Sequence, residues 1–137
     1  MSLVLDSSAA LGWIYPDEDS DAATTIFGLV VESGAWVPSL WPIEVANSLQ
    51  VGVRRGRIDR TFRDAALADL ARLDISVDAE TSNFAWTGTL QFADRFGLTV
   101  YDAAYLELAQ RRSLPLGSLD NSLCGAARTL GVPVIGD

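Results

Sequence analysis

Four acidic residues of the chain lie where predicted helices or strands begin or end. Asp6 and Asp120 each follow an apolar run. Asp102 stands where an apolar run gives way to a helical pattern, and Glu44 lies in an early turn of another predicted helix. Carboxylates that gather repel one another, and without a cation some would take up protons at neutral pH. Their oxygen atoms suit Mg²⁺ or Mn²⁺, ions that can activate a water molecule and stabilise charge on a phosphodiester.

Each of these acids also has an ordinary structural interpretation. Aspartate is a favoured residue at the start of a helix, so Asp6, Asp102 and Asp120 could each cap the helix that follows. Glu44 by itself would be a routine residue on a helix surface. Capping explains each placement singly, but it does not explain why two of the aspartates follow buried runs at one edge of a sheet.

The composition excludes several kinds of active site. The 137 residues include no histidine and no lysine, and all ten basic residues are arginines. Ser-His-Asp triads, Cys-His dyads and histidine-ligated zinc are therefore excluded, as are the lysine of a P-loop and Schiff-base chemistry. Carboxylates, hydroxyls, arginines and any metal that the carboxylates hold remain available. Because the net charge is −8, a nucleic-acid substrate would have to be attracted by local arginines or by bound cations.

Length and hydropathy predict a single domain spanning residues 1–137. The content of 49% apolar and 20% charged residues is typical of globular proteins, and no apolar run approaches the roughly 20 residues of a membrane span. The first residues do not resemble a signal peptide, and the single cysteine, Cys124, cannot form an internal disulfide. We therefore expect a cytoplasmic protein that does not enter membranes.

Short apolar runs alternate with helical patterns along the chain. The predicted strands are 3–5, 35–38, 75–77, 114–119 and 132–135. The predicted helices are 7–14, 17–32, 42–55, 60–73, 81–96, 102–112 and 121–130, and Tyr101, Ala104, Tyr105, Leu108 and Ala109 form the predicted buried face of the sixth. This alternation predicts an α/β fold with a parallel sheet covered by helices on both faces. Ligands of such sheets bind beyond the carboxyl ends of the strands, where Asp6 and Asp120 would stand.

Four segments carry a resemblance to a known family. They are Val4–Ala9 (VLDSSA), Pro42–Asn47 (PIEVAN), Tyr101–Tyr105 (YDAAY) and Ser118–Asp120 (SLD). In this order and spacing they resemble the PIN-domain family, and more narrowly the VapC-type ribonuclease toxins of toxin–antitoxin pairs. The resemblance covers essentially the whole chain.

The resemblance implies a fold and a site. The fold would be a three-layer αβα sandwich whose five parallel strands have the order 3-2-1-4-5, which places the first and fourth strands side by side. The catalytic metal site would consist of Asp6, Glu44, Asp102 and Asp120. Ser8, Asn47 and Ser118 match positions expected to orient those carboxylates. Ser118 stands where the family more often has threonine, so Asp120 could be a ligand only through a water molecule.

The resemblance also implies an activity and partners. The protein would be an endoribonuclease that depends on Mg²⁺, with Mn²⁺ as a substitute, and would leave a 5′-phosphate and a 3′-hydroxyl. It would be the toxin of a toxin–antitoxin pair, form a homodimer and bind a cognate antitoxin whose C-terminal segment lies across the acidic groove. The alternative is a nucleic-acid or protein-binding module in which the acids are structural. A phosphatase or phospho-receiver is disfavoured, because both normally place a lysine beside the acids.

The only dense group of basic residues lies between two predicted helices. Arg54, Arg55 and Arg57 are the candidates for binding substrate phosphates, because arginine matches phosphate bidentately. The alternative is a solvated surface on which these and the nearby arginines pair with Asp59 and Asp64. The four tryptophans are expected in the core or at an interface.

Overall fold

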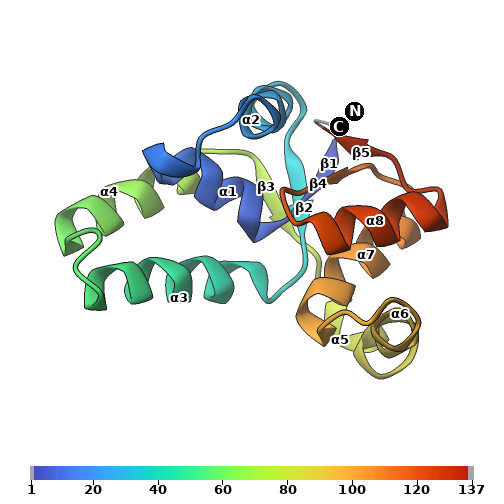
Figure 1. The fold of residues 1–137 in the computed structure, drawn as a ribbon. Coiled ribbons are helices and arrows are strands. Elements are labelled where there is room, and N and C mark those ends of the chain that lie inside the picture. Colours follow the sequence, from blue (N-terminus) through green and yellow to red (C-terminus); the bar gives the residue numbers. More distant parts are fainter. Residues whose placement is uncertain (1, 136–137) are drawn as a thin grey trace.

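One parallel sheet of five strands forms the centre of the molecule (Figure 1). The computed structural model describes residues 2–135, and in it the strands follow the order β3-β2-β1-β4-β5. Their bounds are β1 Leu3–Leu5, β2 Ala35–Val37, β3 Ile75–Val77, β4 Leu116–Gly117 and β5 Val134–Ile135. All four strand pairs are parallel. The predicted fold class and strand order are confirmed.

Helices cover both faces of this sheet, as the sequence predicts. The chain passes from β1 to β2 to β3 in one direction and then crosses back to β4 and β5, so α1–α4 lie on one side and α5–α8 on the other (Figure 1). The helical segments are α1 Ser7–Ile14, η1 Pro16–Glu18, α2 Asp21–Ser33, α3 Trp41–Arg54, α4 Arg60–Ala71, α5 Thr81–Phe84, η2 Ala85–Thr89, α6 Leu90–Phe96, α7 Val100–Arg112 and α8 Asn121–Leu130. None of the helices within residues 2–135 is long and apolar enough to span a membrane.

The central strand β1 is apolar because it is covered from both sides. Leu3, Val4 and Leu5 are almost completely buried, as expected for the middle strand of a doubly covered parallel sheet. Val4 lies opposite Trp36 of β2 and Leu116 of β4. This arrangement makes the end of β1 the point where the strand order reverses, and Asp6 is the first residue beyond it.

Several predicted boundaries differ from those observed. The strands predicted at 114–119 and 132–135 shorten to two residues each, and residues 16–18 form a separate 3₁₀ turn before α2. The helix predicted at 81–96 is helical throughout but contains a π-helical segment at Ala85–Thr89. Trp86 in that segment is 88% exposed and so lies outside the core, whereas the predicted alternative, a place at an interface, stays a prediction.

Helix α7 begins two residues before the predicted start. Thr99 is its cap, because the Thr99 hydroxyl accepts a hydrogen bond of 3.1 Å from the backbone N–H of Asp102. Asp102 therefore lies in the first turn and does not cap the helix. Tyr101, predicted to be buried, is 64% exposed, whereas Ala104, Tyr105, Leu108 and Ala109 are buried as predicted.

Candidate active site

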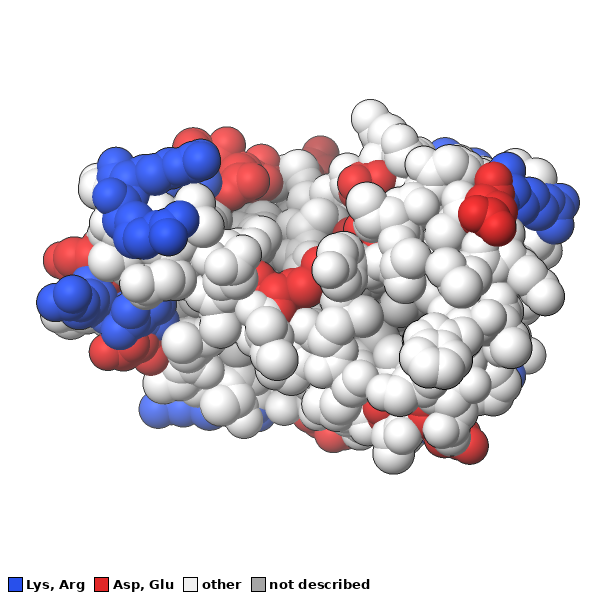
Figure 2. Space-filling view, turned by 90° about the horizontal axis from the view of Figure 1, so that it is seen from below, with Lys and Arg blue, Asp and Glu red and all other residues white. Residues whose placement is uncertain are grey.

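The four predicted acids all lie at the edge of the sheet where the strands end. Asp6 follows β1, and Asp120 follows β4 and caps α8. Glu44 lies in the first turn of α3, which follows β2, and Asp102 lies in the first turn of α7. Figure 2 looks onto this edge and shows acidic side chains in and beside a hollow in the middle of the face. The fold thus brings to one edge four acids that are far apart in the sequence.

Asp6 is the most buried of the four and is held by two serines. Its side chain is 3% exposed, and its Oδ2 accepts hydrogen bonds from the hydroxyls of Ser8, at 2.6 Å, and Ser118, at 2.7 Å. The Ser8 hydroxyl accepts the backbone N–H of Leu119, and the Ser118 hydroxyl accepts that of Asp120. Because each hydroxyl accepts from the backbone, its own proton is directed at Asp6. None of the hydrogen bonds described for residues 2–135 reaches Oδ1 of Asp6.

The capping interpretation holds for one of the three aspartates. Asp120 caps α8 through a bond of 2.9 Å from the backbone N–H of Leu123 to its Oδ1. Asp6 precedes α1 but makes no side-chain cap bond. Asp6 and Asp102 are therefore available for another role.

Glu44 is held by a residue that the sequence analysis did not assign to the site. The hydroxyl of Tyr105 donates a hydrogen bond of 2.5 Å to Oε1 of Glu44. Tyr105 lies three residues after Asp102 on α7 and is fully buried. The sequence signals for Tyr105 were its place in the segment Tyr101–Tyr105, its place on the predicted buried face, and the three-residue spacing that puts it on the same side of the helix as Asp102.

The charges of this cluster are not balanced by nearby cations. Burial raises the pKa of Asp6 in spite of the serine hydroxyls, and the charges of Asp102 and Asp120 raise it further. Burial is also the largest cause of the raised pKa of Glu44, followed in the same direction by Asp6 and Asp102. The pKa of Asp102 is raised by burial and then by Asp120. Within residues 2–135, no arginine forms an ion pair with these carboxyl groups, so the cluster would gain from a bound cation.

The donor set suits a hard cation that keeps part of its water. Within residues 2–135, no group of three or more acidic, histidine or cysteine side chains is gathered closely enough to hold a metal ion jointly. Mg²⁺ is commonly bound through one or two carboxylates and retains several water molecules. The all-oxygen chemistry and the unbalanced charge therefore fit such an ion, with direct contacts from part of the cluster only.

Helix α3 and its C-terminal end carry three further predicted site residues, Asn47, Arg54 and Arg55. Asn47 is exposed on α3, and no hydrogen bond described for residues 2–135 connects it with an acid. Arg54 and Arg55 are exposed at the end of α3. Both remain candidates for contacting a substrate.

Arg57 is already engaged within the protein. Its guanidinium pairs with Asp17, at 2.7 Å, and Glu18, at 3.2 Å, and lies over the ring of Tyr15. Its role in phosphate binding stays a prediction, and a phosphate at this position would compete with Asp17 and Glu18 for the guanidinium. The sequence could not show that the acidic 3₁₀ turn lies opposite this arginine.

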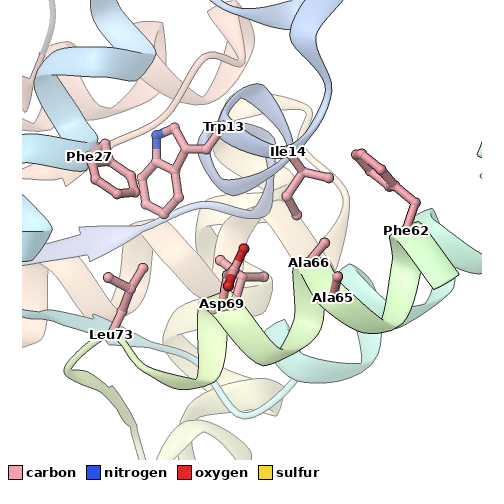
Figure 3. A pocket seen from close by; sticks show the side chains of 9 residues that line it. Trp13, Ile14, Phe27, Phe62, Ala65, Ala66, Asp69 and Leu73 are labelled. Atoms are coloured by element: carbon pink, nitrogen blue, oxygen red, sulfur yellow. The ribbon is translucent and has the colours of Figure 1, made fainter.

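An apolar pocket lies apart from the acids, between α1, α2 and α4. It has a volume of about 420 Å³, and Figure 3 shows Trp13, Phe27 and Phe62 around it. Trp13 packs edge-on against Phe27, with 5.1 Å between the ring centroids. None of the four acids lines this pocket.

Comparison with known proteins supports the resemblance of the four sequence segments to VapC toxins. No family model matches the chain. Ribonuclease VapC3 of Pyrobaculum aerophilum is 29% identical over 133 residues, which is 97% of this chain and 100% of that protein. This chain is similar to a VapC ribonuclease along its whole length. The predicted VapC-type resemblance is confirmed.

A solved structure confirms the fold of this VapC-like chain. The crystal structure of PAE2754 from Pyrobaculum aerophilum matches it with a TM-score of 0.64 and 23% sequence identity. The match covers 92% of this chain and 87% of the other. The similarity therefore extends through both helical layers and the sheet.

Proposed function

We propose that the protein is a metal-dependent endoribonuclease and the toxin of a toxin–antitoxin pair. The observation that carries the proposal is that Asp6, Glu44, Asp102 and Asp120 lie at one sheet edge, with no arginine among residues 2–135 paired to them. The similarity to Ribonuclease VapC3 favours RNA over other phosphodiesters. The chain has no histidine or lysine to act as a general base, so the clustered carboxylates and an ion that they hold are the groups best suited to activate a water molecule.

The chain's own residues would hold and orient the ion. Asp6 presents Oδ1 because the two serine hydroxyls occupy Oδ2. Asp102 lies in the first turn of α7, where the helix dipole favours the ionised carboxylate that a metal requires. Asp120 is steadied by Leu123, so it can act directly or through water. A bound Mg²⁺ or Mn²⁺ would supply water activation and stabilise negative charge on the phosphate.

Substrate and partners are part of the same proposal. RNA approaching a chain of net charge −8 would need the metal and exposed arginines such as Arg54 and Arg55 to offset repulsion. We include a cognate antitoxin in the proposal because of the similarity to Ribonuclease VapC3. The homodimer stays a proposal that rests on the family resemblance alone.

RNA cleavage by Asp102→Asn tests the proposal. Cleavage of a single-stranded RNA by the purified protein should require Mg²⁺ or Mn²⁺ and stop with EDTA. Loss of a residue that merely supports a metal ligand lowers metal affinity or activity by about 10- to 100-fold. Loss of Asp102 should therefore lower the rate of cleavage by about 100-fold or more. Asp94→Asn, at an exposed acid on α6, is the matched control and should cleave normally. Cleavage that persists in EDTA, or undiminished cleavage by Asp102→Asn, would refute the proposal.

The alternative of a binding module has one observation in its favour. The carboxylates are not gathered closely enough for three of them to hold one ion together, within the part of the chain that the structure describes. Metal-independent RNA binding without cleavage would support that alternative.

A further inference from the structure

Tyr105 is the largest of the fully buried side chains among residues 2–135. Its ring belongs to the hydrophobic core, between the sheet and the helices that cover it. Its hydroxyl needs hydrogen-bond partners, because a buried polar group without them is costly. The structure supplies these partners at the acidic cluster and nowhere in the surrounding apolar core.

The Tyr105 hydroxyl joins two elements of the site, because it lies on α7 and donates to Oε1 of Glu44 on α3. A carboxylate oxygen can only accept, so the phenol proton points at Glu44. Burial and then Glu44 raise the pKa of the phenol, whereas the Ser7 side chain, in the first turn of α1 and next to Asp6, also acts on the phenol and lowers its pKa.

This contact restricts how Glu44 can meet an ion. A glutamate on a helix has three rotatable side-chain bonds, and ordering such a chain costs conformational entropy. The bond to Tyr105 holds Oε1 against the core, so Oε2 is the oxygen left for other partners. No basic side chain is among the groups that act on the Glu44 carboxyl. Tyr105 is therefore the only described group that both touches Glu44 and favours its charged form.

We propose that Tyr105 is a positioning residue, which fixes Glu44 so that its second oxygen faces the divalent ion. The inference rests on the metal-dependent function proposed above. It adds Tyr105, on α7, to the four acids of that site. Packing alone would not require the hydroxyl, because phenylalanine would fill the same volume. The test of the inference is therefore to remove the hydroxyl group and keep the ring.

Tyr105→Phe tests the inference by its affinity for Mn²⁺, measured by calorimetry without RNA. Removing a hydrogen-bond partner of a metal ligand typically weakens metal binding by about 10- to 100-fold, and we expect a loss in this range. Circular dichroism should match the wild type. Tyr15→Phe is the control, because Tyr15 is also buried and no hydrogen bond is described for its hydroxyl. This variant should bind Mn²⁺ with the affinity of the wild type.

A second background separates positioning from general damage to the core. If Tyr105 acts through Glu44, Tyr105→Phe should cause no further loss of Mn²⁺ affinity in a Glu44→Gln protein. Damage to the core would lower the affinity by the same factor in both backgrounds. An equal loss in the two backgrounds would overturn the inference.

The outcomes also separate this inference from the function on which it rests. If the wild type binds Mn²⁺ and Tyr105→Phe binds it equally well, the positioning role is wrong and the proposed function stands. If the wild type neither binds Mn²⁺ nor cleaves RNA, both fail. Should Tyr105→Phe not fold, Ser7→Ala removes another side chain that acts on the same phenol. It should weaken Mn²⁺ binding by a smaller factor, and unchanged affinity in that variant would overturn the inference.

Discussion

At the scale of single residues, the acidic cluster combines burial with repulsion. Asp6, Glu44 and Asp102 all have a raised pKa, with burial as the first cause. A carboxyl whose pKa is raised on folding binds more protons folded than unfolded. Its contribution to stability therefore falls as pH rises from the usual aspartate or glutamate range toward the folded value. At neutral pH and without metal, these charges destabilise the fold.

Asp102→Asn should therefore stabilise the metal-free protein. The change removes repulsion with Asp120 and the cost of partial burial of a charge, so Tm at pH 7 should rise by a few degrees. The difference should shrink below about pH 4, where the carboxyl is protonated in both states. Thermal unfolding in EDTA at pH 7 and at about pH 3.5 measures the difference in Tm between the variant and the wild type. A lower Tm for the variant at pH 7 would show that the charge is already compensated.

Sequence patterns and the family resemblance pointed to the four acids and to the two serines, Ser8 and Ser118, that hydrogen-bond Asp6. They did not point to Tyr105 as the residue that holds Glu44. Asp6, Glu44, Asp102 and Asp120 could be chosen because carboxylates at strand ends and helix starts converge in a parallel sheet. Tyr105 was assigned only to a buried face, because its contact with Glu44 joins residues 61 positions apart. Side-chain pairing across that distance depends on how α3 and α7 pack, which local patterns do not encode.

At the scale of helices and strands, local signals predicted some boundaries better than others. Helix α8 begins after Asp120 and ends before Gly131, as predicted, because an aspartate cap and a glycine with positive φ mark its ends. The start of α7 was placed wrongly, since Thr99 and Asp102 are both good capping residues and the sequence does not decide between them. The strands at 114–119 and 132–135 were predicted too long, because buried apolar runs extend beyond the paired residues.

The packing of α3 against the end of α1 provides a test at this scale. A Cβ at Gly52 would collide with the Tyr15 hydroxyl and crowd Ile58, whereas a Cβ at Gly28, within α2, would meet nothing within 4 Å. Gly52→Ala should therefore destabilise the protein by about 1–3 kcal/mol through overpacking. Gly28→Ala should stabilise it by up to about 1 kcal/mol, because alanine is the better helix former. Urea unfolding measures the free energy of unfolding of both variants. Equal changes in that free energy would contradict the close packing around Gly52.

At the scale of the whole molecule, a buried ion-pair network ties the end of β3 to the end of α7. Asp78 is completely buried and accepts hydrogen bonds from Arg111, at 2.6 Å, and from Thr81. Arg111 also pairs with Glu107, at 2.7 Å. Arg112 also pairs with Asp78, at 3.4 Å, so the two arginines at the end of α7 share this acidic partner.

Replacing Asp78 should change the acid sensitivity of the fold. Burial would raise the pKa of Asp78, but hydrogen bonds from Arg111 and Thr81 outweigh it and lower the pKa. A lowered pKa means stability that is present above the usual aspartate value and lost as pH falls through the folded value. Asp78→Asn should lower the free energy of unfolding, measured with urea, by about 3 kcal/mol at pH 7 and by less at about pH 2.5. A cost that does not change with pH would show that the ion pairs contribute little.

The central claim is that the acidic cluster at the carboxyl edge of the sheet holds a divalent ion. Calorimetric titration of Mn²⁺ into the wild type, Asp6→Asn and the exposed-site control Asp94→Asn tests it most directly. We predict saturable binding by the wild type and the control, and binding weakened at least about 10-fold by Asp6→Asn. Absence of binding by the wild type, or equal binding by Asp6→Asn, would contradict the account.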